Sequence, residues 1–183
     1  MPPVLRALPY FDHRTTIAFG GRTVDVVPFQ IALWVSVARP AESAPAPNAR
    51  RFPAVLDTGF SGTFAITPAQ LREWAGIEWS SLLIEPGPEL LYQNVPVPHR
   101  RANLWVYPNQ YGWRDVFDPI MPPYRLELNR GIAVFGNGEC VGVTATRTLT
   151  GPRVPLLGLR ALSDNPVALQ LDPPNRHVWL DGA

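Results

Sequence analysis

Asp57 is the residue whose type and position most directly suggest chemistry in this chain. It lies in the stretch FPAVLDTGFSGTFAIT, residues 52–67, between two short apolar runs that are joined through Gly59 and Gly62. The two runs predict buried strands around a tight turn. A carboxylate at the mouth of such a turn is costly unless another group pairs with it or a reaction uses it.

Other stretches that resemble catalytic or binding motifs are less well formed. GFSGT has Thr63 where a serine-hydrolase elbow requires glycine, and FGNGECVG has the wrong glycine spacing for a dinucleotide loop. Its Asn137-Gly138 is typical of a hairpin turn instead. The three histidines have no carboxylate or cysteine at ligand spacing, so we expect no metal and no cofactor.

Composition narrows the possible partners. The basic residues are all arginine, which leaves out Schiff-base or P-loop lysine chemistry, and the net charge is only +1. Such a balance gives no reason to expect nucleic acid or a membrane surface as a partner. The segment HRRANLWVY mixes arginines with aromatic residues, but it is better explained as an edge strand with solubilising arginines than as a nucleic-acid binder.

Length and cysteine content indicate one domain in a reducing compartment. A chain of 183 residues can bury a core, and we expect a single domain over residues 1–183. Cys140 is alone, so it can form no intrachain disulfide, and we interpret it as a small buried hydrophobe. The N-terminal stretch lacks the apolar run of a signal peptide, and FQIALWVSVA is too short to span a bilayer. We therefore expect a soluble, cytoplasmic protein.

The elements around Asp57 are predicted to be mostly strands and turns. TTIAFGGRTVDVV reads as a hairpin that turns at Gly20 and Gly21. Residues 38–51 are rich in alanine and proline and predict an exposed loop between two strands. One convincing helix begins with Thr67 as its N-cap and ends at Gly76. The 22 prolines of the chain also favour short strands over long helices.

Two later segments complete a recognisable plan. VPLLGLRAL carries Gly158, which lies 101 residues after Asp57. We expect this segment to pack beside the turn at Asp57, with Leu156 and Leu157 deeply buried. VALQLDPPNRHVWL predicts a closing hairpin. With VLDTGFSGTFAITPAQLREWAGI, these segments resemble the retropepsin-like aspartic proteases, in particular the small bacterial and archaeal members with a D-T-G-F-x-G motif. The resemblance covers residues 52–77 and 154–180.

This resemblance implies a mainly β fold, a closed retropepsin-like β-barrel with one or two short helices. It also implies an aspartic endopeptidase, a hydrolase that acts on a polypeptide substrate. Such enzymes use two carboxylates that share one proton, one as base toward water and the other as donor to the carbonyl oxygen. No second D-T-G or D-S-G exists in the chain, so the partner of Asp57 should be the Asp57 of a second copy in a homodimer.

Carried over residue by residue, the resemblance makes Asp57, Thr58 and Gly59 the catalytic motif. Thr58 is expected to hydrogen-bond across the dimer, and Gly59 to let backbone approach the carboxylates. Phe60, Ser61 and Gly62 follow as the substrate-binding stretch. Phe60 stands where the family usually has Ala or Ser, which favours activity nearer neutral pH if its ring faces the carboxylates.

Other features of the family differ in this sequence or have only an approximate counterpart. The ion pair of the viral members is missing, because its two positions hold Ser61 and Leu159. A flap that closes over substrate is expected within residues 82–97, with its tip near Pro86-Gly87-Pro88. Residues 107–124 form an aromatic, proline-rich stretch that could line a substrate groove or an interface.

An alternative from another functional class remains. The chain could be a catalytically silent retropepsin-fold module that binds peptide or mediates assembly, in which Asp57 only ends a strand and caps a turn. The intact D-T-G favours the enzyme, whereas the changes at Phe60, Ser61 and Leu159 favour the silent module.

Overall fold

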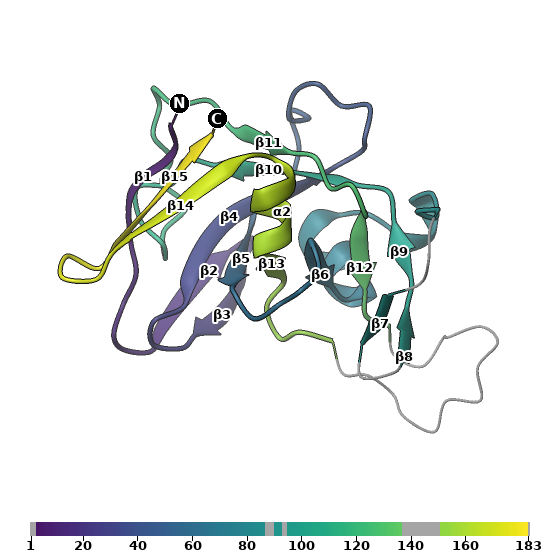
Figure 1. Ribbon diagram of the computed structural model, residues 1–183, viewed down its shortest axis with the longest axis horizontal. Coiled ribbons are helices and arrows are strands. Elements are labelled where there is room, and N and C mark those ends of the chain that lie inside the picture. Colours follow the sequence, from purple (N-terminus) through teal and green to yellow (C-terminus); the bar gives the residue numbers. More distant parts are fainter. Residues whose placement is uncertain (1–2, 87–89, 93–94, 137–150, 183) are drawn as a thin grey trace.

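Short strands dominate the structure, as expected from a sequence in which apolar runs are repeatedly interrupted by proline and glycine (Figure 1). A computed structural model of the chain describes residues 3–86, 90–92, 95–136 and 151–182. The strands are β1 (Pro3–Pro9), β2 (Thr15–Phe19), β3 (Arg22–Val26), β4 (Ile31–Ala38), β5 (Phe52–Asp57), β6 (Phe64–Ile66), β7 (Leu90–Tyr92), β8 (Val95–Val97), β9 (His99–Arg100), β10 (Asn103–Tyr107), β11 (Tyr124–Leu126), β12 (Ile132–Val134), β13 (Leu156–Gly158), β14 (Val167–Asp172) and β15 (His177–Gly182).

The helical elements are few and short. They are α1 (Pro68–Gln70), the π-helical turn η1 (Leu71–Ala75), the 3₁₀ turn η2 (Trp79–Ser81) and α2 (Leu159–Asp164). None of the helices in the described ranges is long and apolar enough to cross a membrane.

An eight-stranded sheet forms the centre of the molecule, in the order β11-β10-β4-β5-β13-β6-β12-β9. Strands β4 and β10 are buried along their whole length, and β5 is buried up to its last residue, which matches their unbroken apolar sequences. The sheet curls into a half-barrel, and β11 and β9 form its two ends (Figure 1). The prediction of a mainly β fold is confirmed.

Strand β13 lies between β5 and β6, next to the turn that begins at Asp57. It runs parallel to β5 and antiparallel to β6, with Gly158 opposite Asp57 in the β5 register. The prediction that VPLLGL packs beside the Asp57 turn is confirmed. Leu157 is fully buried, as predicted, whereas Leu156 is only half-buried.

A second sheet holds both ends of the described chain, in the order β1-β15-β14. The C-terminal strand β15 is its central strand, so hydrogen-bonded neighbours from the same chain fill both of its edges. Figure 1 shows the two termini close together beside this sheet. A second copy that pairs with this sheet through its backbone would therefore have to use the free edge of β1 or of β14.

Local turn and cap predictions are confirmed. β2 and β3 form a hairpin in which Gly20 and Gly21 have φ values of 50° and 75°, a conformation that glycine adopts without strain. Thr67 caps the helix at residues 68–75 through a reciprocal pair of hydrogen bonds with Gln70. Gly76 ends that helix in the left-handed conformation, with φ at 73°.

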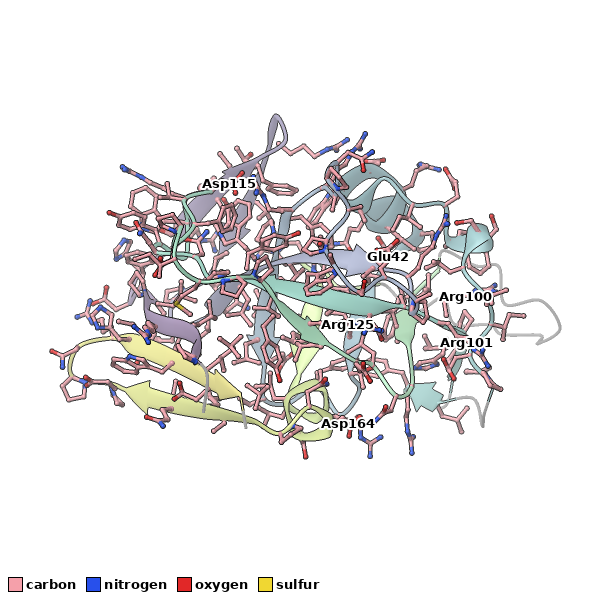
Figure 2. All side chains as sticks on the ribbon, turned by 90° about the horizontal axis from the view of Figure 1, so that it is seen from above. Glu42, Arg100, Arg101, Asp115, Arg125 and Asp164 are labelled. Carbon is pink, nitrogen blue, oxygen red and sulfur yellow. The ribbon has the colours of Figure 1, made fainter. Side chains whose placement is uncertain are left out.

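The two long connections differ in their packing. The loop predicted over residues 38–51 is present between β4 and β5 and is largely exposed, but it begins at residue 39, because Ala38 is the buried last residue of β4. Residues 107–124 instead pack against the sheet, because Phe117 contacts the Trp34 and Tyr107 rings and the Arg51 guanidinium lies 4.3 Å from the Phe117 ring. Asp115 of this segment lies at the opposite end of the molecule from Arg100 and Arg101 of the β9 region (Figure 2).

Candidate active site

Asp57 is the last residue of β5, and its side chain is half-buried where the strand turns into residues 58–62. We refer to residues 57–62 as the Asp57 turn. Asp57 Oδ1 accepts a hydrogen bond of 2.8 Å from the Gly59 N–H, which orients the carboxylate along the turn. A β-carbon at Gly59 would lie 3.3 Å from that same oxygen, so glycine keeps the space beside the carboxylate open.

The Asp57 turn is held from behind by β13. A β-carbon at Gly158 would overlap the backbone carbonyl oxygen of Gly62 and lie 2.7 Å from that of Phe60. The Gly158 N–H donates to the Thr63 carbonyl at 2.9 Å, and the Thr63 hydroxyl donates to the Gly131 carbonyl at 2.6 Å. Glycine at position 158 therefore permits the backbone approach that fixes the turn.

The outer side of the turn is open. Thr58, Gly59 and Ser61 are exposed. Within the part of the chain that the structure describes, the Thr58 hydroxyl has no hydrogen-bond partner. The turn therefore presents a carboxylate, a hydroxyl and bare backbone at the surface, where another chain could reach them.

A cavity of about 170 Å³ lies beside the Asp57 turn, and we call it the Phe60 cavity. Phe60, Ser61 and Gly62 line it, so the structure brings all three predicted substrate-binding residues to one pocket. The other lining residues are Leu91, Tyr92, Val97, His99, Ala133, Phe135 and Arg160. Asp57, Thr58 and Gly59 belong to the same turn but do not line the cavity itself.

The ring of Phe60 forms part of the apolar interior of this region. Phe60 is buried in a cluster with Ala65, Val97 and Phe135, and its ring would contact a β-carbon at Gly62. Phe60, which was predicted to contribute to substrate binding, therefore lies in the wall of the cavity.

The β7–β8 hairpin lies within the predicted flap range and supplies Leu91, Tyr92 and Val97 to the cavity. The ring centroids of Tyr92 and Phe135 are 5.3 Å apart in an edge-to-face arrangement, which joins the hairpin to the sheet. The predicted tip near Pro86 is wrong. In this hairpin Leu90 pairs with Val97 and Tyr92 with Val95, a register that does not have its tip near Pro86; Gly87 and Pro88 lie outside the described ranges.

Sequence reasoning missed His99, Ala133, Phe135 and Arg160 as lining residues. Ala133 and Phe135 alternate along β12 and its extension, a period that could have placed them on one face. Arg160 follows Gly158 by two residues and could have been found from the pairing of β13 with β5. His99 carries no local sequence signal, because only the tertiary arrangement of β9 brings it to the cavity.

His99 is neutral in the cavity wall at neutral pH. Burial lowers the pKa of the imidazole below its ordinary value, and the nearby Arg130 charge acts in the same direction. The 2.9 Å hydrogen bond to the Val97 carbonyl and the Glu85 charge oppose this shift of the pKa without overcoming it. Because a carbonyl only accepts, His99 Nδ1 must carry the proton.

A larger cavity of about 490 Å³ lies at the other end of β5, around Arg22, Arg50, Arg51 and Trp74. The Arg22 guanidinium lies 2.8 Å from the Glu73 carboxylate, and that of Arg51 lies 3.6 Å from Asp115. No residue predicted to carry chemistry lines this cavity. Its size therefore does not make it the better candidate.

In the described ranges, no group of three or more His, Cys, Asp or Glu residues lies close enough together to hold a metal ion. The predictions for Cys140 and for the Asn137-Gly138 turn concern residues outside those ranges. Comparison of the chain with protein-family models, with curated proteins and with solved structures finds no match.

Proposed function

We propose that this chain is an aspartic endopeptidase in which the Asp57 carboxylates of two copies together activate a water molecule. The observation that carries the proposal is the position of Asp57. It is a half-buried carboxylate in a turn with an exposed outer side, next to an apolar cavity under a hairpin. This combination offers an acid–base group, access for a second copy and a place for a substrate side chain.

The requirement for a second copy follows from the chemistry. Peptide hydrolysis by this route needs one carboxylate as base and a protonated one as acid, and like charges at close range favour such a shared proton. The hydrogen-bond partner of Asp57 is a backbone N–H, and the residues lining the adjacent cavity include no carboxylate. The second carboxylate is therefore supplied by Asp57 of another copy across a two-fold axis.

The arrangement of strands supports a retropepsin-like organisation of this site. β13 enters the sheet parallel to β5 and places Gly158 opposite Asp57, and the β7–β8 hairpin lines the cavity as a flap would. In the dimer, the exposed Thr58 hydroxyl bonds to the partner copy beneath the two carboxylates.

The test is the substitution Asp57→Asn, which keeps the shape of the side chain and removes its acid–base function. The variant is expected to fold and to lose essentially all cleavage of a peptide library between about pH 4 and pH 8, because base and acid disappear together. Asp164→Asn is the matched control, because Asp164 is exposed at the end of α2 and its side chain has no described hydrogen bond (Figure 2). Equal cleavage by wild type and Asp57→Asn would reject the proposal.

A catalytically silent peptide-binding module is the second candidate. It is favoured by the single carboxylate that one copy brings to the site. In that case wild type and Asp57→Asn would bind library peptides equally well and neither would cleave them, since asparagine caps a turn about as well as aspartate.

A further inference from the structure

Arg160 holds a fixed place at the Phe60 cavity. It is the second residue of α2, which begins directly after Gly158. Because Gly158 is paired with Asp57 and packed against the Asp57 turn, the start of α2 cannot move without that turn. The Arg160 side chain is exposed and contributes to the cavity wall. The residues that line the cavity include no acidic group.

The charge of Arg160 is unpaired. Across the described ranges, the Arg160 side chain forms no hydrogen bond, ion pair or ring contact. Other arginines do find carboxylates: Arg22 lies 2.8 Å from Glu73, and Arg176 lies 2.8 Å from Asp12. His99, the other basic residue of the cavity, is neutral at neutral pH. The cavity is therefore an apolar space that carries one formal positive charge.

The cavity walls are suited to an apolar stem. Phe60, Val97 and Phe135 are buried and belong to one apolar cluster, and Tyr92 packs edge-to-face on Phe135. A volume of about 170 Å³ is enough for one amino-acid side chain but not for a folded segment. The complementary ligand has a short methylene chain that ends in an anion, because a guanidinium binds a carboxylate through two parallel hydrogen bonds.

We propose that the Phe60 cavity binds a glutamate side chain of a peptide, with its methylenes against Phe60 and Phe135 and its carboxylate on Arg160. This inference deepens the proposed function and rests on it, because it assigns the side chain that the endopeptidase selects next to the bond it cleaves. The aspartate side chain is one methylene shorter and fits the same arrangement less well.

The experiment compares peptides that are identical except for Glu, Gln, Leu or Lys at each position in turn, all with amidated C-termini. Cleavage is measured as kcat/KM with the active protein, and equilibrium binding is measured with Asp57→Asn. The variants are Arg160→Gln and Arg160→Glu. Arg39→Gln is the matched control, because Arg39 is an exposed arginine in the 38–51 loop with no described side-chain contact. Thermal unfolding checks that every variant is folded.

We expect one peptide position at which Glu is preferred over Gln by about tenfold, the size of one charge-assisted hydrogen bond near the surface. Arg160→Gln should abolish that preference, Arg160→Glu should transfer it to Lys, and Arg39→Gln should leave it unchanged. A preference that persists in Arg160→Gln would overturn the inference. So would a preference that follows a free C-terminal carboxylate and not the side chain.

The two proposals can fail separately. Cleavage without any glutamate preference would reject the glutamate site and leave the endopeptidase standing. An Arg160-dependent preference in binding, without cleavage by the wild type, would support the glutamate site and reject the endopeptidase. A folded protein that neither binds nor cleaves any of these peptides would reject both.

Discussion

At the scale of single residues, backbone contact accounts for the glycine at position 158. The nearest neighbours of a β-carbon there would be carbonyl oxygens and the Phe60 ring, and backbone cannot move aside as a flexible side chain can. Gly158 also faces Asp57 in the register of β13 and β5. A change at this residue therefore acts on the position of the carboxylate.

Gly158→Ala is predicted to lower the free energy of unfolding by about 1–3 kcal/mol, the usual range for overpacking a well-packed site. It should also reduce cleavage activity, because the Asp57 turn must shift. Urea unfolding measures the first effect. Gly136→Ala is the control, since its β-carbon would meet only Pro68 Cγ at 4.0 Å. Equal stability of the two variants would contradict the close approach described here.

At the scale of elements, the features that local chemistry determines were predictable. The Gly20-Gly21 hairpin, the Thr67 cap and the helix end at Gly76 depend on a few adjacent residues, and the structure confirms each of them. The position of the flap tip was not predictable in this way. The prolines near residue 86 suggested a turn there, whereas the hairpin is defined by the pairing of β7 with β8, which these prolines do not reveal.

Leu157→Ala is predicted to cost about 2–5 kcal/mol of unfolding free energy, because β13 lies between β5 and β6 and Leu157 is fully buried there. Leu171→Ala on β14 is the matched control, since that side chain is 52% exposed and should change stability by less than about 0.5 kcal/mol. Chemical denaturation measures both. A loss below about 0.5 kcal/mol for Leu157→Ala would show that β13 is not a core strand.

At the scale of the whole molecule, the proposed activity depends on how two copies meet. The open side of the Asp57 turn is available for this contact, whereas both edges of β15 are already paired within the chain. The sequence could not predict that β15 is a central strand, nor that Arg160, Phe135 and His99 share a cavity with Phe60. These arrangements join segments that are far apart in the chain, and no local pattern records which of them pair.

Mixing wild type with Asp57→Asn is predicted to inhibit activity more than simple dilution does. If two copies share the active site, only dimers of two wild-type copies are active. An equal mixture after subunit exchange should therefore retain about a quarter of the activity of pure wild type at the same total protein concentration. Dilution with Asp164→Asn should cause no loss. Retention of about half the activity in the Asp57→Asn mixture would mean that each copy works alone.

The pairing of β1 with β15 has a consequence for how the protein is made. Pro9 pairs with His177, so β1 is synthesised well before the strand that it pairs with. At a synthesis rate of about 5–20 residues per second, that interval is roughly 8 to 34 seconds. During it, the side chains of Val4, Leu5 and Leu8 lack the strand that later buries them. During this interval β1 is therefore an apolar strand without its partner, and this segment is the natural place for a chaperone to bind.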